Sequence, residues 1–162
     1  MLKYLNTQVT FAEVPNEITL CINITGCKIR CKNCHSSYLA EDIGNPLNKT
    51  VLSKLLEDNK GISCVSFMGG DSNPINIIAL ASWVKTHTNL KVAWYSGRQE
   101  ISDIVARQLR WFDYIKLGPY IEEFGPLNSK TTNQRMYKVI EQNGNYGLVD
   151  ITNKFWKHEV EN

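Results

Sequence analysis

Three cysteines, Cys27, Cys31 and Cys34, follow one another at a C-x3-C-x2-C spacing. Cysteine thiolates are the ligands of iron–sulfur clusters, and four of them normally hold a cubane cluster. The two remaining cysteines, Cys21 and Cys64, do not stand at a spacing that completes the set. Three thiolates leave one iron open, and an open coordination position is where a metal site binds a substrate. The spacing therefore predicts a cluster with one iron available to a ligand.

The same stretch allows a second interpretation. Three cysteines together with His35 have the donor set of a Cys3His zinc site. Adjacent Cys34 and His35 would be strained as ligands of one ion, and the spacing differs from the two-residue gaps of paired zinc knuckles. The motif alone leaves both metal sites open, so the rest of the chain has to decide between them.

The chain alternates apolar, β-branched runs with amphipathic segments. Strands are predicted at residues 18–24, 62–68, 90–95 and 112–117, with further ones at 136–140 and 147–151, and helices at 50–59, from Asn73 and Pro74 onward, and through 101–109. Residues 1–17 are expected to form a lead-in or a short hairpin. This order predicts an α/β fold with right-handed βαβ units and a parallel sheet.

Unusual residues stand at the end of each of the first four predicted strands. They are the cysteine stretch, Gly69-Gly70-Asp71, Ser96-Gly97-Arg98 and Lys116-Leu117-Gly118. Ligands of parallel sheets and barrels bind at the carboxyl ends of the strands. Four separate loops are therefore expected at the same edge of the sheet, which favours an active site over a structural zinc knuckle.

Composition restricts the class of protein. The chain has 162 residues, a formal net charge of +2 and 5 cysteines. This length suits one domain of ~100–150 residues or slightly more. The small charge argues against nucleic acid as a partner, and no apolar run is long enough for a membrane span. An odd number of cysteines without a secretory signal predicts a cytoplasmic protein in which Cys21 and Cys64 are small buried thiols.

The cysteine motif resembles the signature of the radical S-adenosylmethionine (SAM) enzymes. In that family three cysteines hold a 4Fe–4S cluster, and the open iron chelates the amino and carboxylate groups of SAM. The resemblance implies Cys27, Cys31 and Cys34 as metal ligands, with no catalytic residue beyond the cluster and SAM. It also implies SAM contacts from Cys34 and from Asn33 and His35. Asn33 replaces the aromatic residue that often seats the adenine, so its backbone is expected to make that contact.

The residues at the ends of the later predicted strands resemble further motifs of this family. Gly69-Gly70-Asp71 resembles the Gly-Gly-Glu motif that binds the methionine amino group, in which glycines let the backbone approach the ligand. Because Asp71 is shorter than Glu, a carbonyl near Gly69 is the alternative contact. Ser96 is expected to meet the ribose or carboxylate of SAM, and Lys116 its carboxylate. A plain turn is the alternative for both the glycine motif and Ser96.

The resemblance tightens to the activating proteins of anaerobic ribonucleoside-triphosphate reductase over residues 18–140. The stretches that carry it are Cys34-His35-Ser36, Phe67-Met68-Gly69-Gly70-Asp71, Trp94-Tyr95-Ser96-Gly97 and Asn133-Gln134-Arg135. It implies a single radical SAM domain over 1–162, a trimmed partial (βα)6-type open barrel whose parallel sheet has outer helices. It further implies SAM cleavage, a glycyl radical on the reductase, and an electron donor such as flavodoxin or ferredoxin.

The partner is expected to contact the basic residues Lys28, Arg30 and Lys32 and the polar loop 128–135. Three other functions stay open. A 7-carboxy-7-deazaguanine synthase has a comparably compact barrel, whereas activators of pyruvate formate-lyase are usually longer. A non-enzymatic zinc or iron–sulfur binding module is the alternative from another class.

Overall fold

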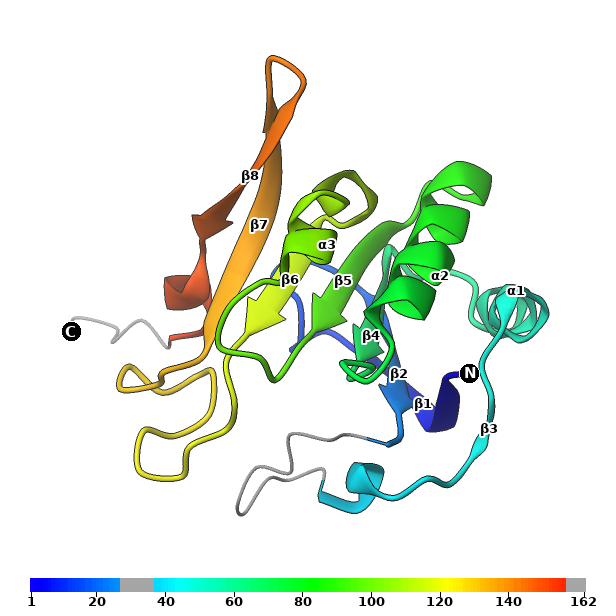
Figure 1. Ribbon diagram of the computed structural model, residues 1–162, viewed down its shortest axis with the longest axis horizontal. Helices are drawn as coiled ribbons and strands as arrows, with labels where there is room; N and C mark the ends of the chain where they lie inside the picture. The colour runs from blue at the N-terminus through cyan, green and yellow to red at the C-terminus, as the bar shows by residue number, and fades with distance from the viewer. Residues whose placement is uncertain (27–36, 157–162) are drawn as a thin grey trace.

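The computed structural model describes residues 1–26 and 37–156, in which helices pack against one mixed sheet (Figure 1). Within these residues eight strands are hydrogen-bonded in the order β3-β1-β2-β4-β5-β6-β7-β8. The strands are β1 (Lys3–Thr10), β2 (Thr19–Ile24), β3 (Asn45–Pro46), β4 (Cys64–Met68), β5 (Lys91–Tyr95), β6 (Tyr114–Leu117), β7 (Arg135–Gln142) and β8 (Asn145–Asp150). The α-helices are α1 (Lys49–Asp58), α2 (Pro74–His87) and α3 (Asp103–Ala106), and short 3-10 helices cover Ser37–Ala40, Leu109–Trp111 and Thr152–Phe155.

The centre of the sheet is a parallel block of four strands, β2, β4, β5 and β6. The four strands predicted first along the sequence are these, so their existence is confirmed. Helices α1, α2 and α3 lie in the three connections between them, which supplies the crossover that a parallel pair needs. All four strands point the same way, and their carboxyl ends lie at one end of the sheet (Figure 1).

The outer strands run antiparallel to their neighbours, so the sheet is not parallel throughout. β1 pairs with β2, β7 with β6 and β8 with β7, each in antiparallel register. The connection 118–134 contains no helix and carries prolines and glycines, so β7 returns beside β6 without a crossover. The predicted strands at 136–140 and 147–151 exist as this β7–β8 hairpin, and residues 3–10 add a strand. The assignment to a partial (βα)6 barrel stays a prediction.

One face of the sheet packs against the helices and forms the main core. Side chains of β4 that point to this side, Val65 and Phe67, are fully buried with Ile77 and Val84 of α2. Helix α2 begins as predicted, because the side chain of Asn73 accepts a hydrogen bond from the Asn76 amide (3.2 Å) and Pro74 follows it. The buried residues of this helix, which form its apolar stripe, are Ile77, Leu80, Ala81 and Val84.

The third helix is shorter than predicted. The segment 101–109 was expected to be one helix, but α3 covers only Asp103–Ala106 and a 3-10 turn follows at Leu109–Trp111. Val105 and Leu109 are buried, whereas Ile104 is exposed. The β-branched residues at 104 and 105 lower helix propensity, and the side chain of Ser102 makes no capping hydrogen bond.

The other face of the sheet carries a second, smaller core. It is built from strand residues such as Cys64, Ala93 and Tyr114, and Val14 and Ile151 cover them. Val14 lies in the loop between β1 and β2, and Ile151 directly follows β8. This face is therefore closed by segments from the two ends of the chain, a contact that strand patterns alone do not predict.

A buried carboxylate ties the β1–β2 loop to the amino ends of the central strands. The Glu17 carboxylate accepts hydrogen bonds from Lys91 Nζ (2.7 Å) and Ser63 Oγ (2.5 Å), and Tyr114 lies at 3.5 Å. Burial by itself would raise the pKa of Glu17, but hydrogen bonds from Lys91 and Ser63 outweigh it and hold the pKa below its ordinary value of 4.5. Because the folded pKa is lowered, this carboxylate stabilises the fold above pH 4.5, and the contribution is lost as the pH falls further.

Replacement of Lys91 by Met tests this contact. The variant leaves Glu17 buried without its cation, and we expect a loss of roughly 1–3 kcal/mol in unfolding free energy at pH 7. Urea unfolding at pH 7 and near pH 4 measures it, and the difference from the parent should shrink at the lower pH. Lys54→Met is the control, because the Lys54–Asp58 pair is exposed and should be worth less than about 1 kcal/mol. An equal loss at both pH values would contradict the assignment.

Candidate functional site

The carboxyl ends of the central strands hold the described part of the predicted site. The segment with Cys27, Cys31 and Cys34, and with the predicted contacts Asn33 and His35, lies outside the described residues. The chain enters that segment directly from the end of β2. There, Ile24 O lies 3.2 Å from where a β-carbon on Gly69 would be, so β2 ends beside the glycine motif.

The glycine pair after β4 is required by packing. Gly69 and Gly70 have φ values of 106° and 95°, a region that favours glycine. A β-carbon on Gly70 would lie 2.6 Å from Ile77 Cδ1, which is inside the core under α2. The expected reason for the glycines was close approach of a ligand, whereas this side of Gly70 faces protein. Any contact with SAM has to come from backbone atoms, and it stays a prediction.

The backbone of Gly69 is already hydrogen-bonded to the neighbouring strand. Its amide donates to Tyr95 O (3.0 Å), and its carbonyl accepts from Trp94 Nε1 (2.8 Å). The indole of Trp94 is buried and stacks on Phe112. The end of β4 is thereby fixed against the end of β5, as a preorganised binding loop requires.

Asp71 is buried and its carboxylate binds the loop after β5. Oδ1 accepts a hydrogen bond from Ser96 Oγ (2.6 Å), and Oδ2 accepts one from the Gly97 amide (2.9 Å). Arg98 Nε lies 3.9 Å from Oδ1, and its side chain is half exposed. The structure therefore brings together two predicted site residues, Asp71 and Ser96, through a direct contact between their side chains.

Lys116 joins the same network from β6. Its buried Nζ donates to Gly118 O (2.8 Å) and Ser96 O (3.3 Å), and it lies 5.9 Å from the centre of the Tyr95 ring. The Ser96 amide in turn donates to Lys116 O (2.9 Å). Three neighbouring strand ends are thus linked by hydrogen bonds, and a buried ammonium group stands at the last of them.

A cavity of about 500 Å³ opens at these strand ends. One wall consists of Met68, Tyr95 and Lys116, which lie at the carboxyl ends of β4, β5 and β6. The opposite wall comes from elsewhere in the chain: Ala12, Glu13, Tyr120, Pro126, Leu127, Asn128, Gln134 and Phe155. Ligand cavities commonly measure ~300–1,000 Å³ and combine apolar walls with a few polar groups, so this one suits a small organic cofactor.

Several residues of this cavity were not singled out from the sequence. Met68 and Tyr95 alternate with Phe67 and Trp94 of the helix-side core, so period-two alternation could have placed them on the opposite face. Nothing in the pattern identifies Glu13, which reaches the cavity from the β1–β2 loop. Its carbonyl accepts a hydrogen bond from the Tyr95 hydroxyl, and burial raises the pKa of Tyr95 well above its ordinary value. This hydroxyl therefore stays protonated as a donor.

The two cysteines within the described residues are not suited to bind metal. Cys21 and Cys64 are buried and free, which confirms the prediction for both. Burial raises the pKa of each thiol to about 12, whereas a metal ligand must be a thiolate. Over residues 1–26 and 37–156, no three His, Cys, Asp or Glu side chains are grouped so as to hold a metal ion. In that part of the chain no helix has the length and apolar character of a membrane span.

Comparison with known families agrees with the cysteine motif. Residues 18–140 match the model of a family described as 4Fe-4S single cluster domain. This range holds all three cysteines of the motif and the carboxyl ends of β2, β4, β5 and β6. An iron–sulfur cofactor, the first of the two metal sites that the spacing allows, is thereby supported. No curated protein and no solved structure matches the chain.

Proposed function

The chain belongs to the family of 4Fe-4S single cluster domains, and from this premise we propose that it is a radical SAM activating enzyme. It would bind SAM at the open iron of a cluster held by Cys27, Cys31 and Cys34. Its substrate would be a glycine in an anaerobic ribonucleoside-triphosphate reductase, on which it generates a glycyl radical. A one-electron donor such as flavodoxin or ferredoxin is required for each cleavage of SAM.

One observation carries the proposal. The cavity lined by Met68, Tyr95 and Lys116 lies at the end of the sheet from which the chain enters the cysteine segment. A cluster with an open iron and a cofactor-sized cavity would then share one mouth, as reductive cleavage of a bound molecule requires. A binding module that only holds a cluster has no need of this cavity.

The described residues would have distinct roles in this chemistry. The cluster, when bound, would supply the electron for the reductive cleavage of SAM. Lys116 would offer its buried ammonium group to the carboxylate of the methionine part. Met68 and the ring of Tyr95 would form an apolar wall that keeps water from the reacting atoms. The products would be methionine and 5′-deoxyadenosine, with the hydrogen atom of the latter taken from the glycine Cα of the reductase.

A second cavity beside the first favours a polypeptide as substrate. It measures about 520 Å³ and adjoins the first, because Ala12, Asn128 and Phe155 line both. It is also lined by Phe11, whose side chain is 74% exposed, and by Lys154. We assign this second cavity, which we call the entry cleft, to the glycine-bearing loop of the reductase. An inserted loop would cover the cofactor cavity and exclude solvent during the reaction.

The direct test is SAM cleavage. Protein reconstituted anaerobically with iron and sulfide should, with SAM and dithionite, release 5′-deoxyadenosine and methionine in equal amounts, as measured by mass spectrometry. Omission of the reductant should abolish both products. A protein that holds its cluster yet leaves SAM intact under reduction would be an iron–sulfur binding module, and the proposal would be wrong.

A further inference from the structure

The carboxylate of Asp71 already has protein partners for both of its oxygens. It is 7% exposed, and it accepts hydrogen bonds from Ser96 Oγ and the Gly97 amide at 2.6 and 2.9 Å. Ser96 Oγ also accepts from the Arg98 amide (3.1 Å), so one carboxylate organises three successive residues. These two hydrogen bonds use about two of the roughly four acceptor sites of the carboxylate, and its burial leaves the others little access to the ammonium group of a ligand.

The loop that Asp71 holds is connected to the cavity. Ser96 O accepts a hydrogen bond from Lys116 Nζ, and Arg98 O accepts one from the Gly118 amide (2.6 Å). A displacement of residues 96–98 would therefore move the acceptors that hold the lysine at the cavity wall. Asp71 lies one contact behind this wall, because the cavity is lined by Lys116 and Tyr95 and not by Asp71.

We propose that Asp71 is a positioning residue, which fixes the loop 96–98 against Lys116 and does not itself contact the cofactor. The inference rests on the proposed SAM site and changes the role of its acidic residue. The side chain of Asp71 would act on the carboxylate of the methionine part, through the shape of the loop and the placement of Lys116. A direct ion pair would act only on the amino group of the methionine part.

Two ligands separate these roles. SAM carries the amino and carboxylate groups, whereas decarboxylated SAM keeps the amino group and lacks the carboxylate. We expect Asp71→Asn to weaken the binding of SAM by a factor of about ten or more and that of decarboxylated SAM by less than about twofold, measured by anaerobic equilibrium dialysis on cluster-loaded protein. A similar tenfold loss for both ligands would overturn the proposal, because it would show a direct contact with the amino group.

A matched control separates a specific loss of ligand affinity from a loss caused by lower stability of the fold. Asp113 also binds a backbone amide, that of Val92 (2.8 Å), and a cation, Lys85 (2.9 Å), but at the amino end of β6. Asp113→Asn should lower the unfolding free energy and leave the affinity for both ligands within a factor of two. A similar loss of affinity in this variant would attribute the Asp71 effect to stability and would also contradict the proposal.

A third measurement needs no ligand and no cluster. If Asp71 acts through Ser96, the changes Asp71→Asn and Ser96→Ala disrupt the same contact. The unfolding free energy of the double variant should then be no lower than that of the less stable of the two single variants. Independent, additive effects on urea unfolding would contradict the positioning role. If the parent protein binds neither ligand, the proposed SAM site fails, and this cycle still decides whether Asp71 and Ser96 act as a unit.

Discussion

Alanine at Cys27, Cys31 or Cys34 is expected to abolish the 4Fe–4S cluster, whereas alanine at Cys21 or Cys64 should leave it in place. Each of the first three is predicted to supply one of the thiolates that the cluster needs, and no described cysteine is available to replace it. Anaerobic reconstitution followed by iron and sulfide analysis should give about four irons per chain for the parent and close to none for the three variants. The visible absorption of the cluster should disappear with the iron.

The two control cysteines are buried within the core. The pKa of both Cys21 and Cys64 is raised to about 12 by burial, so both are thiols at neutral pH. Their replacement should cost about 0.5–3 kcal/mol of stability, because small buried side chains are lost. A cluster that survived Cys27→Ala but not Cys64→Ala would refute the ligand assignment. One zinc per chain, lost in His35→Ala, would favour the Cys3His site instead.

The central strands could be predicted because their signal is local. Runs such as 18–24 and 62–68 are apolar and β-branched, and the glycines after them mark where they end. The same holds for the start of α2, which Asn73 and Pro74 fix. Because parallel strands share their direction, the predicted motifs after β4, β5 and β6 lie at one end of the sheet.

The remaining features depend on contacts between distant segments. The direction of β7 follows from a long loop without a helix, and the period of residues 136–140 does not encode it. The far wall of the cavity combines Glu13, Gln134 and Phe155, which are brought together only by the fold. The partner of Asp71 is equally non-local, because Ser96 lies after the next strand. A sequence motif can indicate which type of residue stands at a site, but the contacts of that residue in the fold decide its role.

Addition of the reductase should convert slow, uncoupled SAM cleavage into rapid cleavage that leaves a glycyl radical. The entry cleft explains this expectation, since a loop seated against Phe11 and Phe155 would close the cavity and supply the hydrogen donor. Electron paramagnetic resonance detects the glycyl radical, and mass spectrometry counts 5′-deoxyadenosine per radical. The ratio should approach one with the reductase present.

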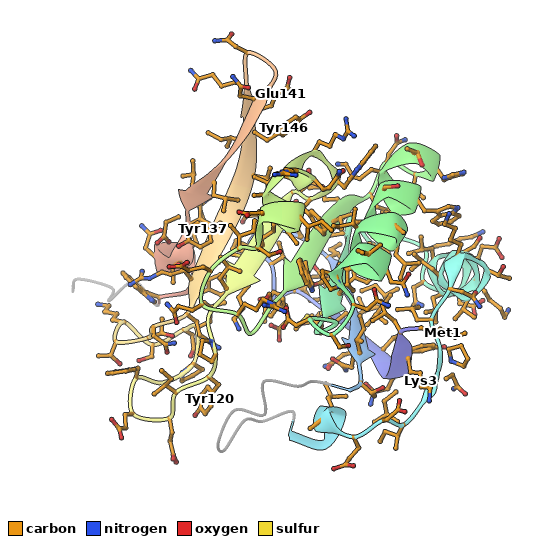
Figure 2. The ribbon with its side chains drawn as sticks, in the orientation of Figure 1. Met1, Lys3, Tyr120, Tyr137, Glu141 and Tyr146 are labelled. Atoms are coloured by element: carbon orange, nitrogen blue, oxygen red, sulfur yellow. The ribbon has the colours of Figure 1, made fainter. Side chains whose placement is uncertain are left out.

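Variants of the cleft separate partner binding from cofactor binding. Phe11→Ser should lower the reductase-dependent rate about tenfold or more, as expected for the loss of an aromatic contact worth roughly 1.5–3 kcal/mol. SAM affinity and the basal cleavage rate should change little. Tyr146→Ser is the matched control, because this exposed tyrosine lies at the tip of the β7–β8 hairpin, far from Tyr120 at the cavity (Figure 2).

Charge should contribute to the same encounter. Charge reversal at Arg30, or at Arg135 at the end of the loop 128–135, is expected to weaken coupling to the reductase more than SAM binding, and high salt should have the same effect. Arg135 also pairs with Asp150 (3.6 Å), so the stability of Arg135→Glu must be measured alongside. If Phe11→Ser and both charge reversals left coupling intact, the entry cleft would not be the docking site. If the isolated protein instead converted a small pterin-like substrate at full rate, the partner would be unnecessary, and a 7-carboxy-7-deazaguanine synthase-like reaction would replace glycyl radical formation.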